Sequence, residues 1–110
     1  MIVTGEVRFA EPPRLPAGAV AHVRLLDTTY ADAAAKVVAE RKLTDIAGES
    51  FEFALEASDI DPLRRYTVSV HISAQGGNRI QPGDYLNTQD YPVLTRSYPS
   101  RVSVIVSRVR

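Results

Sequence analysis

The 110-residue sequence contains no cysteine, no excess of charge of either sign and no long apolar run. Without cysteine there is no disulfide, no thiolate nucleophile and no zinc or iron–sulfur site with cysteine ligands. Lysine plus arginine and aspartate plus glutamate number 13 each. The chain therefore lacks the basic excess that nucleic-acid binding usually requires. The apolar runs span only a few residues, far fewer than the roughly 20 needed to cross a bilayer.

The length and the first residues bound the domain organisation and the localisation. A chain of this length suits one domain, residues 1–110, that folds around its own core. Strand-like sequence follows Met1 at once, without the charged segment and apolar stretch of a signal peptide. Two expectations therefore stay open. The protein is cytoplasmic, or the sequence is a mature or trimmed form of an exported protein.

Apolar and polar residues alternate along most of the chain, which predicts β-strands. Because side chains at every second position of a strand share a face, Val3, Val7 and Phe9 predict a half-buried strand over residues 2–9. The same pattern predicts strands over residues 19–27, 37–46, 51–56, 66–74 and 101–109, with short strands at 79–81 and 85–88. Residues 30–36 alone have helix propensity and are too few for a stable helix. We therefore expect an all-β protein, a small antiparallel β-sandwich of seven to eight strands, immunoglobulin- or transthyretin-like.

Tyr66 follows a proline-containing corner, Ile60-Asp61-Pro62-Leu63-Arg64-Arg65, and begins a predicted strand. In β-sandwiches a tyrosine at such a position often forms a tyrosine corner. We predict that its ring is buried and that its hydroxyl bonds to the backbone of the corner.

Residues 82–99 form the only segment with a local shift in composition, because they hold three of the five tyrosines and three of the seven prolines. Tyrosine offers apolar area with a polar end, which suits interfaces. Proline holds a segment extended and lowers the ordering cost of binding. Tyr85, Tyr91 and Tyr98 are therefore candidate contacts for a partner. The alternative is that the segment folds over the open end of the sandwich and completes the core, which we expect for Val93 and Leu94.

The two histidines are expected to be solvated. His22 shares a face with Arg24, and His71 lies between the inward positions Val70 and Ile72. Two histidines on different strands could meet across a sheet and bind a metal ion, but no carboxylate lies at ligand spacing beside either. No metal site is predicted.

Other candidates for chemistry have ordinary structural interpretations. His71 and Ser73 share a strand face, but no G-x-S-x-G motif is present. Asp59 and Asp61 precede a proline, which is typical of a turn. Gly76-Gly77 lacks the spacing and the following helix of a phosphate-binding loop. The sequence therefore predicts no enzyme, no catalytic residue and no cofactor.

Several short segments occur in the order found in one known family. They are Val3-Thr4-Gly5-Glu6-Val7, Leu15-Pro16-Ala17-Gly18-Ala19, Leu25-Leu26-Asp27 with Ala31-Asp32-Ala33, Phe51-Glu52-Phe53-Ala54-Leu55, Ile60-Asp61-Pro62 with Arg65-Tyr66, and Tyr91-Pro92-Val93-Leu94-Thr95. This set resembles the YbaY/YscW-type lipoprotein family, which includes the pilotin chaperones of type III secretion.

The resemblance implies a compact, non-catalytic β-sandwich that a lipidated N-terminal cysteine tethers to the bacterial outer membrane. Pilotin members bind an outer-membrane secretin, so the implied partner is a secretin-like protein segment. The sequence has neither lipobox nor cysteine, so a lipid anchor, and with it a periplasmic or outer-membrane location, requires a lipobox upstream of Met1. We expect a non-enzymatic, protein-binding or chaperone-like envelope module. A small-ligand or lipid-binding β-sandwich and a cytoplasmic structural domain stay open as alternatives.

Overall fold

A computed structural model describes residues 1–30, 32–44, 46 and 48–110, and these ranges contain eight β-strands and no helix. The strands are β1 (Ile2–Phe9), β2 (Val20–Asp27), β3 (Lys36–Leu43), β4 (Ser50–Glu56), β5 (Tyr66–Ser73), β6 (Tyr85–Leu86), β7 (Pro92–Val93) and β8 (Arg101–Arg108). Within the described ranges there is accordingly no apolar helix of the length that a membrane crossing needs.

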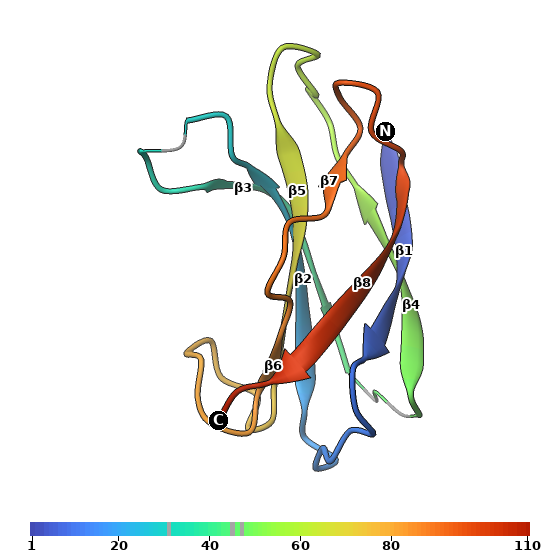
Figure 1. The fold of residues 1–110 in the computed structure, drawn as a ribbon, viewed down its shortest axis with the longest axis vertical. Helices are drawn as coiled ribbons and strands as arrows, with labels where there is room; N and C mark the ends of the chain where they lie inside the picture. Colours follow the sequence, from blue (N-terminus) through green and yellow to red (C-terminus); the bar gives the residue numbers. More distant parts are fainter. Residues whose placement is uncertain (31, 45, 47) are drawn as a thin grey trace.

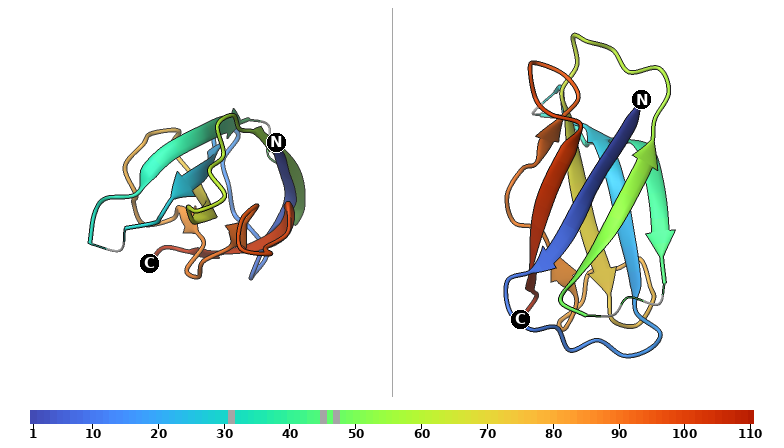
Figure 2. Two further views of the ribbon diagram at one scale, coloured as in Figure 1. Left: turned by 90° about the horizontal axis from the view of Figure 1, so that it is seen from above. Right: turned by 90° about the vertical axis from the view of Figure 1, so that its right-hand side faces the viewer.

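The strands form one strongly curved sheet in the order β3-β2-β5-β6-β8-β1-β4, and β7 pairs with β5 beside this path. Seen from above, the sheet almost encloses a central space (Figure 2). One layer consists of β4, β1 and most of β8, and the other of β3, β2 and β5 (Figure 1). β8 joins the layers, because residues 101–106 pair with β1 and residues 107–108 pair with β6. The predicted all-β sandwich is confirmed.

The pairing differs from the predicted antiparallel sheet at one place. β1 and β8 run parallel, with Gly5 opposite Val102 and Val7 opposite Val104. The other pairs are antiparallel. Alternation within a strand shows which side chains share a face but not the direction of its neighbour, so the sequence pattern could not reveal this pair.

Most of the predicted strands are present, with small shifts of their ends. The predicted strand 37–46 begins at Lys36 and ends at Leu43, and its residue 45 lies outside the described residues. The prediction of a strand at 79–81 is wrong, and β7 was not predicted. The 30–36 connector includes residue 31, also outside the described residues, and its described part contains no helix.

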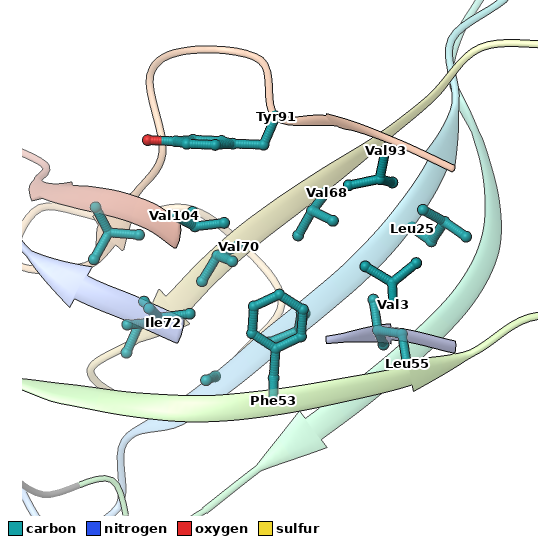
Figure 3. Close-up of a cluster of buried hydrophobic side chains, with 14 of the residues drawn as sticks. Val3, Leu25, Phe53, Leu55, Val68, Val70, Ile72, Tyr91, Val93 and Val104 are labelled. Atoms are coloured by element: carbon teal, nitrogen blue, oxygen red, sulfur yellow. The ribbon is translucent and has the colours of Figure 1, made fainter. Parts of the chain in front are cut away.

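The core lies between the two layers and consists of the alternating apolar side chains of both (Figure 3). Its larger fully or nearly fully buried members are Val3, Val7, Val23, Leu25, Phe53, Leu55, Val68, Val70, Ile72, Val93, Val104 and Val106. Each such side chain stabilises the fold by about 1.5–3 kcal/mol relative to an exposed position. Phe53 projects from β4 into the middle of this cluster (Figure 3).

β5 lies between β2 on one side and the short strands β6 and β7 on the other, and it is buried on both faces. All of its residues except Ser69 are buried. One face points into the core, whereas the chain that follows the strand covers the other. This second cover changes the environment of several residues of the candidate site.

Candidate functional site

Tyr66 forms the predicted tyrosine corner. Its side chain is buried, and its hydroxyl accepts a hydrogen bond from the backbone N–H of Asp61 over 3.0 Å. The carboxylate of Asp61 accepts a hydrogen bond from the N–H of Leu63 over 2.9 Å, which closes the turn around Pro62. The prediction for Tyr66 is confirmed, and Asp61 has the expected turn role.

Tyr85 and Tyr91 are core residues, because only 1% and 8% of their surfaces are exposed. The Tyr85 ring packs edge-on against Phe9 with 5.1 Å between the ring centroids, and its hydroxyl accepts a hydrogen bond from the N–H of Arg14. Tyr91 extends over the core (Figure 3), and its hydroxyl accepts a hydrogen bond from the N–H of Ile105 in β8 over 2.9 Å. Their rings are not accessible to a partner in this structure, so the alternative reading, completion of the core, describes both.

The cause is the pairing of residues 85–93 with β5. Tyr85 pairs with Ile72 and Val93 pairs with Tyr66, so the segment behaves as an interrupted strand beside β5 and its alternate side chains point inward. Between the two pairs, the side chain of Asn87 accepts a hydrogen bond from the N–H of Val70. Tyr98, beyond the paired segment, is 50% exposed. Of the three predicted contact residues it alone offers its ring to solvent, and its role in binding stays a prediction.

The expectation that the two histidines are solvated is wrong, since His22 is 1% exposed and His71 is 4% exposed. They lie on the face of β2 and β5 away from the core, as predicted, and are direct neighbours in the pairing of these strands. Their rings stack with centroids 5.5 Å apart. The loop of residues 74–84 covers them, which the alternation within a strand could not show.

Asp84 fixes this loop over the histidines. Its carboxylate accepts hydrogen bonds from Nε2 of His71 over 2.8 Å and from the N–H groups of Ala74 and Gln81 over 3.0 Å each. Burial opposes ionisation of Asp84, but these three donors outweigh it and hold the pKa of the carboxyl below its usual value. Sequence spacing did not reveal this partner of His71, because Asp84 is 13 residues away along the chain.

His22 is held neutral by its surroundings. Burial and the positive charge of Arg24 lower its pKa below 6.5. Its Nε2–H donates to the carbonyl oxygen of Gly77 over 3.3 Å. Among the described residues, no cluster of three or more histidine, aspartate or glutamate side chains has the arrangement of a metal site. The hydrogen bonds of His22 to Gly77 and of His71 to Asp84 fix the 74–84 loop to the sheet.

The end of the molecule that contains Tyr98 is built from three loops, and we refer to residues 28–30, 58–65 and 94–98 as the loop end. The second and third loops lie together at the top of Figure 1. The N–H of Thr28 donates to the carbonyl of Arg65 over 2.9 Å, and Thr95 donates its hydroxyl to the carbonyl of Arg64. Arg96 donates to the carbonyl of Leu63 over 3.3 Å. These bonds fix the three loops to one another.

Two pockets open at the loop end on either side of Tyr66. The larger has a volume of about 570 Å³, and its walls include Thr28, Arg65, Asp90, Thr95, Arg96 and Tyr98. The smaller, about 440 Å³, is lined by residues that include Asp27, Val37 and Arg64. Both volumes lie in the range of typical ligand pockets.

Large apolar side chains surround these pockets in exposed positions. Leu63 is 79% exposed and Tyr30 is 63% exposed. The guanidinium of Arg64 lies 5.8 Å from the centre of the Tyr30 ring and forms an ion pair with Asp27 over 2.9 Å. Hydrogen bonds from the hydroxyl and N–H of Thr29, together with Arg64, hold the pKa of Asp27 below its usual value. The loop end thus combines exposed apolar groups with a rigid polar framework.

The loop end also contains the strained backbone of the molecule. In the described residues, the four non-glycine positions with positive φ are Asp59, Leu94, Arg96 and Ser97. Such conformations cost about 1–3 kcal/mol each and often occur at functional sites. Three of them, Leu94, Arg96 and Ser97, are in the 94–98 loop, which contributes Thr95, Arg96 and Tyr98 to the walls of the larger pocket.

Comparison with known proteins identifies the family. Residues 1–106 match the family described as type III secretion system lipoprotein chaperone (YscW). The chain belongs to the YscW family. The resemblance noted in the sequence is therefore confirmed, and a family of chaperones indicates a non-enzymatic role for this member.

A solved structure supports the YscW assignment. The structure of an alternative pilotin from the type II secretion system of Vibrio cholerae superposes with a TM-score of 0.80 at 28% identity. The alignment covers 100% of this chain and 97% of that chain. The search of curated proteins gave no match. This YscW protein thus shares its fold over its whole length with a pilotin.

Sequence reasoning missed Arg65 and Arg96 as candidates for a site at the loop end. Arg65 ends the proline-containing corner directly before Tyr66, and Arg96 follows Thr95 in the tyrosine- and proline-rich segment 82–99. The signal available was the position of a cation in each of these two segments. Their meeting around one pocket depends on the pairing of β7 with β5, which the pattern did not predict.

Proposed function

We propose that this YscW-family protein is a pilotin-like chaperone that binds an exposed segment of a secretin-like outer-membrane protein. The family and the pilotin structure support a chaperone role in secretion. We further propose that the segment docks on the loop end. The observation that carries this placement is Tyr98, half exposed at the wall of the larger pocket and next to the strained loop.

The physical argument rests on what each group contributes on binding. Exposed tyrosine and leucine gain most from burial against a partner, and a rigid surface loses little conformational entropy when it binds. Tyr98 and Leu63 provide the apolar area, and the hydrogen bonds between the three loops provide the rigidity. By contrast, the apolar side chains of the core fill the space between the layers, which gives no support to a lipid carrier.

The test is capture of a purified secretin, encoded in the same genome, by this protein and its variants. Tyr98→Ala and Leu63→Ala should each weaken binding by about 1–3 kcal/mol, as interface anchors do. Ile80→Ala is the matched control, because Ile80 is 58% exposed and lies in the 74–84 loop, away from the loop end. All three variants should keep the melting temperature of the wild type, since surface changes usually alter stability by less than about 0.5 kcal/mol.

Tyr85→Ala and Tyr91→Ala distinguish core residues from contact residues. Removing a buried aromatic ring should lower the free energy of unfolding by about 3–5 kcal/mol. We therefore expect both variants to melt well below the wild type. Folded Tyr98→Ala and Leu63→Ala proteins that capture the secretin as well as the wild type does would refute the loop end as the binding surface.

A further inference from the structure

The larger pocket of the loop end is lined by two arginines, Arg65 and Arg96. In the part of the chain that the structure describes, no carboxylate oxygen lies within 4.0 Å of their side-chain nitrogens, whereas the neighbouring Arg64 pairs with Asp27 and Asp61. One nitrogen of Arg96 donates to the carbonyl of Leu63. Other arginines among the described residues also form no ion pair, but these two line the same pocket.

Hydrogen bonds hold the backbone segments that carry Arg65 and Arg96 in place. The N–H of Arg65 donates to the hydroxyl of Thr29 over 3.0 Å, and its carbonyl accepts from Thr28. Arg96 lies in the loop that the bond from Tyr98 N–H to the carbonyl of Thr95 closes over 3.0 Å. A cation on an ordered backbone loses less entropy on binding than one on a mobile loop.

The charge of the pocket is positive on balance. Asp90 is the one carboxylate among its lining residues, against the guanidinium groups of Arg65 and Arg96. The remaining polar side chains of the wall are threonines, Tyr66 and Tyr98. A concave surface with charge of one sign concentrates its field and attracts groups of the opposite sign.

We propose that this pocket binds an aspartate or glutamate side chain of the partner segment, flanked by an apolar residue. This inference rests on the proposed function. Each guanidinium presents paired donors that match the two oxygens of a carboxylate. The apolar neighbour packs on the exposed ring of Tyr98, and a backbone N–H of the segment donates to Asp90. A phosphate fits less well, because it carries more negative charge toward Asp90.

The probe is a synthetic peptide, acetyl-Gly-Leu-Glu-Glu-Leu-Gly-amide, together with its counterpart in which glutamine replaces both glutamates. Each is titrated into the ¹⁵N-labelled protein, and the backbone amide shifts are followed by NMR. We expect saturable shifts at residues 64–67 and 90–98 and at least about fivefold weaker binding of the glutamine peptide. Raising the salt from low to physiological concentration should weaken only the glutamate peptide.

Arg65→Gln and Arg96→Gln should reduce the affinity for the glutamate peptide to that for the glutamine peptide. Arg79→Gln is the control, because Arg79 is an exposed arginine of the 74–84 loop and does not line this pocket. It should bind as the wild type does. Equal affinity for the two peptides, absence of binding, or equal effects of Arg96→Gln and Arg79→Gln would overturn the inference.

Two further outcomes separate this inference from the proposed function. If Tyr98→Ala loses the secretin and the two arginine variants keep it, the charge inference fails and the docking surface stands. If Tyr98→Ala keeps the secretin, the docking surface fails, and the peptide titration still decides the chemistry of the pocket. The protein could also sediment with phosphatidylglycerol vesicles in a manner that depends on the two arginines, and fail to bind the glutamate peptide. This result would assign the pocket to a lipid headgroup and refute the proposal that it binds an acidic peptide segment.

Discussion

Replacing Gly5 by alanine should disrupt the packing of β1 between its two neighbours, β4 and β8. Gly5 lies opposite Phe53 of β4 and opposite Val102 of β8. A Cβ atom at this position would be 2.3 Å from the carbonyl oxygen of Val102 and 2.6 Å from Cζ of Phe53. Both distances are far shorter than a carbon atom tolerates. Gly5→Ala therefore creates steric clashes with the backbone of Val102 and with the side chain of Phe53.

The expected loss of stability follows from which atoms can move. Phe53 is packed in the middle of the core, so its ring can rotate away only by displacing its neighbours. The Val102 carbonyl belongs to the backbone of β8, so moving it disturbs the parallel pair itself. Overpacking of a core usually costs about 1–3 kcal/mol. With both contacts violated, we expect a loss near 3 kcal/mol, which corresponds to a melting temperature about 12 °C lower for a domain of this size.

Urea denaturation of five proteins tests this reasoning: the wild type, Gly5→Ala, Phe53→Leu, the double variant and Gly18→Ala. Phe53→Leu shortens the side chain and relieves the ring contact, so the double variant Gly5→Ala/Phe53→Leu should recover about 0.5–1.5 kcal/mol relative to additivity. The double variant should not recover the full stability, because the clash of the new Cβ with the Val102 carbonyl oxygen remains. Gly18→Ala is the control, since a Cβ there meets no atom within 4 Å. If Gly5→Ala unfolds at the same urea concentration as Gly18→Ala, the steric argument is wrong.

Three further predictions concern the corner and the buried polar cluster. Tyr66→Phe should cost about 1 kcal/mol through the lost bond to Asp61; a melting temperature equal to that of the wild type would contradict it. The pKa of His22 lies below 6.5 in the folded state, so the unfolded state binds the proton more readily as the pH falls. The contribution of His22 to the free energy of unfolding is therefore complete above pH 6.5 and is lost as the pH falls below this value. The lowered pKa of Asp84 adds a second loss below pH 3.8. Urea midpoints from pH 7.5 to 5 should fall for the wild type but stay flat for His22→Gln, and parallel profiles would refute the assignment. Zinc should not raise the melting temperature, and a rise that both His22→Ala and His71→Ala abolish would reveal a metal site.

The strands and the tyrosine corner were predictable from the sequence because both depend on local order. Alternation over eight residues fixed β1, β2 and β5 within one or two residues of their ends. Tyr66 was predictable because the proline corner and the tyrosine are adjacent in sequence. These features require no knowledge of distant partners.

The histidines and tyrosines show where local pattern fails. Alternation correctly placed His22 and His71 on the face away from the core, but whether a loop covers that face depends on Asp84 and the residues around it. In the same way, Tyr85 and Tyr91 are buried because residues 85–93 pair with β5. Each of these contacts joins two segments of the chain, and no local sequence pattern shows that the two segments meet.

The arginines of the candidate site could be predicted only in part. The corner that contains Arg65 and the 82–99 segment that contains Arg96 stood out in the sequence through proline and tyrosine. Their convergence on one pocket requires the position of β7 beside β5. A sequence pattern thus indicated the segments of the site but not their shared surface.

The parallel pair of β1 and β8 has a consequence for how the chain acquires its structure during synthesis. β1 ends at Phe9, and its partner begins at Arg101. At a synthesis rate of 5–20 residues per second, β1 waits roughly 5–20 s for β8. During this interval the edge of β1 that pairs with β8 has no partner. A nascent chain of this protein therefore presents an open strand edge until residues 101–106 are made.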